Sequence, residues 1–254
     1  MIYLYGLLEE PASGHEVLAG MAGVTGPIAL ARLPGGILIY SSATEADILP
    51  RRRLLLAHTR VLEAAAWFGN LLPMRFGMMA STLAEVAAML ASRLTELCAA
   101  FDRVRGRVEL GLRLSFPREP ALAATLATAP DLAAERARLL ALRRPDPMAQ
   151  AEFGRRLAER LDARRGETQR LLFQSLRPLW VDHRLRVPDS DVQVIAVDVL
   201  VEDGAQDRLA AALVKAAADC SFAPTAEPSV RVIGPVPLFN FVDLVLSPRR
   251  EEVA

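Results

Sequence analysis

Three histidines are the side chains best suited to acid–base chemistry or metal binding, because imidazole titrates near neutral pH. They are His15, His58 and His183. Their separations fit neither the HExxH spacing of zinc sites nor a CxxC-type cluster. Asp182 stands beside His183, but adjacent side chains point apart on most backbones, so this pair makes a poor dyad. His58 falls within a predicted helix, where we expect a partly buried, hydrogen-bonded imidazole rather than a ligand.

Other signatures of catalysis are missing from the sequence. It contains no GxSxG elbow, no Walker loop and no GxGxxG element. The carboxylates of DGAQD at 203–207 lack EF-hand spacing. Cys98 and Cys220 have no CxxC neighbour, and we expect both to be buried free thiols. These observations predict a protein that is not an enzyme, with no catalytic residue, no metal site and no cofactor.

The composition suits a globular protein that does not bind nucleic acid. Of the 254 residues, 52% are apolar, and 30 basic side chains balance 30 acidic ones. A general nucleic-acid binder would carry a basic excess. No apolar run reaches the roughly 20 residues needed to span a bilayer, and the N-terminus lacks the basic region of a signal peptide. We therefore expect a cytoplasmic protein with neither nucleic acid nor a lipid membrane as a partner.

The first part of the chain predicts a small sheet covered by helices. Three apolar runs favour strands, at residues 2–8, 28–33 and 37–41. Pro34-Gly35-Gly36 indicates a hairpin turn. A helical pattern follows at 44–68, interrupted by Pro50, and then the short segment LLPMRFG at 71–77. Thr82 and Glu85 form a capping box for a helix whose apolar stripe extends to Phe101.

The second part begins with VELGLRLS at 108–115, whose alternation predicts a half-buried strand with Glu109, Gly111, Arg113 and Ser115 facing outward. An Ala/Leu/Arg-rich helix at 121–142 follows. Asp146-Pro147 opens a long charged helix that extends to about Arg177. The remaining elements are a strand at 192–201, a helix at 205–219 and a last strand region at 231–241.

These elements predict an α+β protein with two small sheet-plus-helix domains, ferredoxin-like in character. The N-terminal domain, residues 1–105, has the order β-β-β-α-β-α. The C-terminal domain, residues 106–254, has the order β-α-α-β-α-β and includes a helical insertion at 121–178. Its long charged helix lies either on its own domain or against a second copy.

Arg75 stands out because it lies between Met74 and Phe76 in an otherwise apolar segment. A charge in such a place needs a carboxylate partner or a route to solvent. The favoured interpretation is an ion pair with Glu63 or Glu109 that holds helix to sheet. The alternative is a direct contact between Arg75 and a partner protein.

The segment GPVPLFNF at 234–241 contains two prolines within a β-like run. Proline lacks the N–H of a ladder bond, so it favours an edge strand or a bend. One interpretation is a kinked edge strand that closes the second domain, and the other is an exposed apolar lip that offers phenylalanines to a hydrophobic protein. The candidate partner-binding residues are Arg75, Phe76, Pro235, Pro237, Phe239 and Phe241.

Four segments in order resemble the gas vesicle protein F and L family. They are IYLYGL at 2–7, LPMRFG at 72–77, GRVELGLRL at 106–114 and VRVIGPVPLFNFV at 230–242. The last departs from the common family form, which has Trp at the position of Val236, Pro at that of Leu238 and Tyr at that of Phe239. The tail therefore keeps its stiffness and apolar character but loses an indole and a hydroxyl.

The resemblance implies a non-enzymatic assembly protein or minor shell component of gas vesicles, the gas-filled shells that provide buoyancy. The implied partners are the hydrophobic major shell protein and other gas vesicle accessory proteins. The implied location is the cytoplasm, in association with the gas vesicle and on its gas-facing surface. A different class stays open, a small-molecule sensor or enzyme on ferredoxin-like domains, with a pocket lined by His58, Arg75 or His183.

Overall fold

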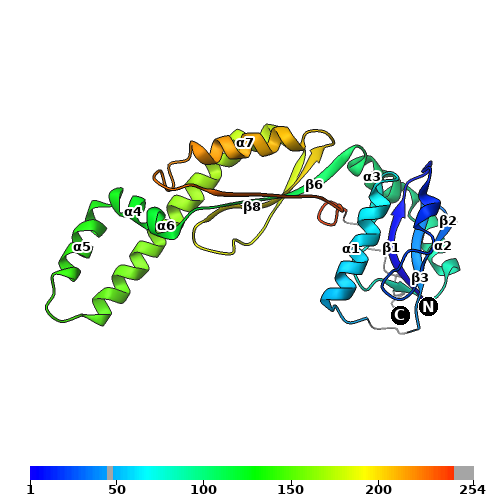
Figure 1. The fold of residues 1–254 in the computed structure, drawn as a ribbon, viewed down its shortest axis with the longest axis horizontal. Helices are drawn as coiled ribbons and strands as arrows, with labels where there is room; N and C mark the ends of the chain where they lie inside the picture. The colour runs from blue at the N-terminus through cyan, green and yellow to red at the C-terminus, as the bar shows by residue number, and fades with distance from the viewer. Residues whose placement is uncertain (45–47, 243–254) are drawn as a thin grey trace, which may run out of the picture. The chain divides into compact units, whose positions relative to one another are not determined.

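The computed structural model describes residues 1–44 and 48–242, and its chain forms two compact units (Figure 1). Among the described residues, unit 1 comprises residues 1–44, 48–109 and 235–242, and unit 2 comprises Leu110–Gly234. This division differs from the predicted domains 1–105 and 106–254, because residues 237–242 pack on the first unit after β9 (Ser229–Val236) has completed the sheet of the second. The predicted α+β class with two sheet-plus-helix units is confirmed.

The sheet of unit 1 is built around its first strand, β1 (Ile2–Leu8), which is buried along its whole length. Its other strands are β2 (Ile28–Leu33), β3 (Gly36–Ser42), β4 (Leu71–Pro73) and β5 (Met79–Ala80). β1 pairs antiparallel with β3 along one edge and with both β4 and β5 along the other, and β2 pairs with β3. The predicted hairpin is confirmed, with Gly35 at φ +90°, as the third residue of a type II turn requires.

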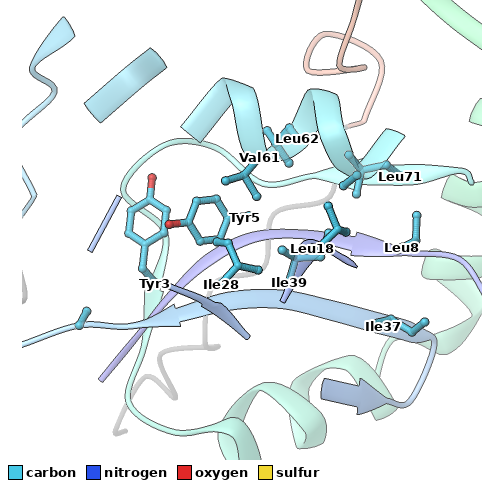
Figure 2. Packing of buried hydrophobic residues seen from close by; sticks show 12 residues of the cluster. Tyr3, Tyr5, Leu8, Leu18, Ile28, Ile37, Ile39, Val61, Leu62 and Leu71 are labelled. Atoms are coloured by element: carbon cyan, nitrogen blue, oxygen red, sulfur yellow. The ribbon is translucent and has the colours of Figure 1, made fainter. Parts of the chain in front are cut away.

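Helices cover both faces of this sheet. α1 (Arg52–Ala66) and the 3-10 helix η1 (His15–Leu18) contribute to one cluster of buried side chains, and Figure 2 shows Val61 and Leu62 of α1 over the sheet. α2 (Leu83–Ala91) and α3 (Leu94–Val104) contribute to a second cluster. A bulge in β1 between Leu4 and Gly6 shifts the alternation of its side chains by one residue. Residues 2, 4 and 7 thereby join the α2/α3 cluster, and residues 3, 5 and 8 join the α1 cluster.

Two predictions for the helices of unit 1 need correction. The single helix expected from Thr82 to Phe101 is divided at Ser92, whose hydroxyl donates to the Met89 carbonyl at 2.8 Å. The predicted cap at its start is confirmed, because the Glu85 N–H donates to Thr82 Oγ1 at 3.1 Å. Cys98, expected to be buried, is exposed on α3. The described part of the helix predicted at 44–68 is α1, and residues 45–47 of that prediction lie outside the described residues.

Unit 2 contains a four-stranded sheet in the order β7-β8-β6-β9. Its strands are β6 (Arg107–Ser115), β7 (Asp182–Leu185), β8 (Gln193–Glu202) and β9 (Ser229–Val236). With α6 (Pro147–Leu176) between β6 and β7, and α7 (Gln206–Ala218) between β8 and β9, the chain order is β-α-β-β-α-β. That order is the ferredoxin-like arrangement, so the predicted ferredoxin-like character holds for unit 2, whereas unit 1 begins with three strands.

The helical insertion of unit 2 contains one more helix break than predicted. α4 (Arg118–Ala127) and α5 (Pro130–Leu140) replace the single helix expected at 121–142, because Pro130 lacks the N–H that would continue α4 and suits a helix start. The long charged helix is confirmed as the 30-residue α6, capped by Asp146, whose side chain accepts from the Ala149 N–H at 3.1 Å. Within the residues that the structure describes, no helix is both long and apolar enough to cross a membrane.

Strand β6 is more buried than its alternation predicts. Glu109 is only 2% exposed, and a Cβ added to Gly111 would lie 3.3 Å from the Asp198 carboxylate and 3.4 Å from Ile233. Asp198 itself is 5% exposed, accepts from Arg113 at 3.0 Å and is paired with Arg186. Around Gly111 and Arg113 the outward face of β6 is therefore covered by a buried ion-pair cluster rather than by solvent.

We expect Asp198→Asn to lower the free energy of unfolding by about 1–3 kcal/mol, because Arg113 would lose a charged acceptor in a half-buried place. Urea denaturation at neutral pH measures this change. Asp191→Asn is the matched control, since its ion pair with Arg118 is largely exposed, at 46% and 62% for the two side chains. Equal effects of the two substitutions would contradict a structural role for the Asp198 cluster.

Candidate functional site

The segment LPMRFG and the C-terminal stretch meet in unit 1 around His58. His58 lies on the inner side of α1 and is 2% exposed. Four other aromatic residues surround or adjoin it, and together with His58 they form what we call the aromatic cluster: Tyr3, Tyr5, Phe76 and Phe239. Ring centroids lie 5.4 Å from His58 for Tyr5, 5.8 Å for Phe76 and 6.3 Å for Phe239.

Hydrogen bonds determine which nitrogen of His58 carries the proton. Nε2 lies 3.0 Å from the Met74 carbonyl, which only accepts, so Nε2 donates. Nδ1 lies 3.0 Å from the Tyr3 hydroxyl, and that hydroxyl accepts the Gly77 N–H at 3.1 Å, so its own proton goes to Nδ1. Burial lowers the pKa of His58, although the Met74 carbonyl opposes the shift, and burial raises the pKa of Tyr3. The imidazole is thus neutral and has a partner at each nitrogen.

These bonds hold a turn that interrupts the edge of the sheet between β4 and β5. The Met78 N–H donates to the Arg75 carbonyl at 3.3 Å. Gly77 has φ +86°, a backbone conformation that residues with a side chain rarely adopt. On either side, Met74 N–H donates to Tyr5 and the Met78 carbonyl accepts from Leu4. Residues 75–77, which we call the RFG turn, therefore project from a fixed base.

Arg75 does not form the ion pair that we favoured from the sequence. Its side chain is exposed at the start of the RFG turn, and no carboxylate within residues 1–44 and 48–242 pairs with it. Glu63 faces solvent on α1, while Glu109 is buried and bonded by Asn240. Phe76 beside it is half-buried. The RFG turn thus presents an exposed guanidinium next to an aromatic ring.

The C-terminal stretch is docked on unit 1 through residues 237–242, which we call the terminal segment. Phe241 is 1% exposed and Pro237 is also buried, so the prediction of an exposed lip is wrong for these two residues. Phe239 is half-buried beside His58. Pro235 is exposed in β9, the outer strand of its sheet, as the edge-strand interpretation predicted.

The other two histidines, His15 and His183, are not part of the aromatic cluster. His15 is buried at the start of η1 and its Nδ1 lies 2.8 Å from the Ala12 carbonyl, and His183 lies in unit 2 against Phe173 and Trp180. The described residues include no group of three His, Cys, Asp or Glu side chains that could hold a metal ion. His58 and Arg75 lie in unit 1, whereas His183 lies in unit 2.

Sequence reasoning missed Tyr3, Tyr5 and Asn240. The two tyrosines carried a usable signal, because a hydroxyl in a fully apolar strand must find a partner when it is buried. Tyr5 finds Ser41 at 3.1 Å and the Val24 N–H at 2.6 Å. Asn240 carried none, because its acceptor Glu109 is more than a hundred residues away.

Comparison with known proteins places these features in context. Residues 1–243 match the family model described as gas vesicle synthesis protein GvpL/GvpF. Gas vesicle protein F from Microcystis aeruginosa (strain PCC 7806) is 33% identical over 138 residues, which are 53% of this chain and 56% of that protein. Gas vesicle protein F from Streptomyces sp. (strain CB03234) is 27% identical over 242 residues, 95% of this chain and 99% of that one.

The fold is also similar to solved structures. The crystal structure of the gas vesicle protein GvpF from Anabaena sp. PCC7120 gives a TM-score of 0.80 at 20% identity, covering 96% of this chain and 98% of that chain. That of GvpF from Microcystis aeruginosa gives 0.73 at 22% identity, covering 96% and 99%. At these identities the structures establish a shared fold over nearly the whole chain.

We expect the stabilising effect of His58 to depend on pH. Its pKa is lowered in the folded state, so below the unfolded value of about 6.5 the unfolded chain binds a proton that the folded chain excludes. The free energy of unfolding then falls as pH drops, by at most about 1.4 kcal/mol per pH unit. His58→Gln should lower stability by about 1–3 kcal/mol at pH 7.5, and this difference should narrow toward pH 5. Urea denaturation of both proteins at several pH values measures this difference. A difference in the free energy of unfolding that stays the same at every pH would contradict the prediction.

Proposed function

The chain belongs to the GvpL/GvpF family of gas vesicle synthesis proteins, and from that premise, which gives it a role related to gas vesicles, we propose a more specific one. It is a non-enzymatic assembly protein or minor shell component that binds the hydrophobic major shell protein and other gas vesicle accessory proteins during vesicle formation. The observation that carries this proposal is the exposed Arg75 on a turn whose base is rigidly held.

The RFG turn has the properties of a contact surface. Arginine and aromatic residues are enriched in protein interfaces, and Arg75 is exposed without an ion pair among the described residues, next to the half-buried ring of Phe76. The bonds of Tyr3 and His58 beneath it fix the backbone before a partner arrives, which reduces the entropy lost on binding. An exposed position favours the partner-contact interpretation of Arg75 over the ion-pair interpretation.

The other candidate residues divide by exposure. Phe239 is half-buried beside His58 and contributes to the proposed surface together with the RFG turn. Pro235 is exposed in β9 and offers a separate contact, whereas Pro237 and Phe241 anchor the terminal segment from inside. A very apolar shell subunit has strand edges and helix faces that aggregate when left free. A partner with a fixed turn could bind such subunits. Prolines in its edge strand would keep that strand from adding to other exposed strands, because proline lacks the N–H of a ladder bond.

We expect Arg75→Glu to reduce capture of purified shell protein at least tenfold while leaving the melting temperature nearly unchanged, because surface substitutions usually alter stability by less than about 0.5 kcal/mol. A pull-down with titrated shell protein, combined with thermal unfolding, measures both. Arg208→Glu is the matched control, an exposed arginine on α7 in unit 2. Unchanged capture by the Arg75 variant would exclude the RFG turn from the contact.

Association with the vesicle is tested by co-flotation. We propose that the protein is located in the cytoplasm at the gas vesicle and on its gas-facing surface, and therefore expect it to float with intact vesicles and to resist added protease until the shells are collapsed. Retention after a urea wash would identify a shell component. Removal by urea with intact capture of shell protein would identify an assembly factor, and failure in both assays would contradict the proposed function.

A further inference from the structure

We propose that unit 1 carries a receptor surface for a short peptide in a turn conformation, occupied here by the chain's own terminal segment and able to bind the same segment of a second copy. The receptor surface consists of the buried carboxylate of Glu109, the ring of His58 and the apolar cluster under α2 and α3. This inference rests on the docked segment alone and does not depend on a role in gas vesicles.

The polar part of the receptor surface recognises both backbone and side chain. Glu109 is 2% exposed, and its Oε2 accepts the backbone N–H of Asn240 at 3.1 Å. Its other oxygen accepts from the Asn240 side-chain amide. Two donors from one residue on one buried carboxylate make this position selective, since few side chains other than asparagine offer an N–H at that reach.

The apolar part binds residues on both sides of Asn240. Phe241 is 1% exposed, and Leu238 and Val242 pack against the α2/α3 cluster. Phe239 packs instead against the cluster under α1, with its ring stacked on His58. Side chains of one short segment therefore enter both clusters, Leu238 and Val242 the one under α2 and α3 and Phe239 the one under α1.

None of these contacts requires the segment to belong to the same chain. The residues that precede it, 231–235, are exposed in the edge strand β9, so the chain leading into the segment is accessible to solvent. Exchange of an identical element between copies preserves every contact and is a low-cost route to association. A tethered segment has an effective concentration in the millimolar range, so the intramolecular arrangement prevails until copies are crowded together.

A truncated chain that ends at Gly234 provides the test, with a fluorescent synthetic peptide of residues 235–242 as the probe. We expect saturable one-to-one binding by fluorescence anisotropy. Peptides with Asn240→Ala or Phe241→Ala should bind at least tenfold more weakly, as should wild-type peptide to the truncated chain carrying Glu109→Gln. The full-length chain should bind the peptide far more weakly than the truncated chain, because its own segment competes.

Equal binding of all peptides, or none by a truncated chain shown to be folded by circular dichroism, would overturn the proposal. If truncation prevents folding, full-length Asn240→Ala serves instead, and it must bind the peptide more tightly than wild type does. For the second copy, truncated chain is mixed with full-length Glu109→Gln, whose weakened receptor surface should favour release of its own segment. Light scattering should detect a heterodimer absent from either protein alone; a mixture that stays monomeric would contradict exchange between copies.

Discussion

The two hydrogen bonds of His58 are the interaction on which the proposed contact surface depends. One imidazole joins three elements, because it lies on α1, receives the Tyr3 hydroxyl from β1 and donates to the Met74 carbonyl beside β4. Tyr3 then holds Gly77, so the backbone of the RFG turn is fixed through a chain of two side chains. In an apolar interior each of these polar groups would be costly without its partner. The network therefore specifies one arrangement of helix, sheet and turn.

A histidine engaged in this way is unsuited to chemistry. Both nitrogens have partners, burial keeps the ring neutral, and aromatic rings lie against it. His58, the residue that first suggests acid–base catalysis, thus has a structural role. Arg75 in the neighbouring RFG turn is the charged residue that is exposed to solvent. The family that the chain belongs to is named for gas vesicle synthesis and not for a reaction.

The terminal segment follows directly on β9, a strand whose outer edge is unpaired among the described residues of its sheet. β9 is an outer strand with exposed Val232 and Ile233, and Pro235 near its end removes a ladder donor. Beyond it the chain returns to unit 1, where Glu109 and the two apolar clusters bind residues 237–242. Aromatic residues that could have formed an apolar surface patch are instead used to attach the C-terminal stretch.

Most of the secondary structure and the fold class could be predicted from local features of the sequence. Hydrophobic period, proline and glycine positions, and the caps at Thr82 and Asp146 predicted most elements, the α+β class and the long helix, because each depends on neighbours within a few residues. The family motifs pointed to LPMRFG and the terminal prolines. Only the tertiary structure decided that Arg75 is exposed, that Phe241 is buried and that Glu109 pairs with Asn240. Those outcomes depend on contacts between residues far apart in the chain, and neither periodicity nor composition encodes which distant partner satisfies a buried polar group.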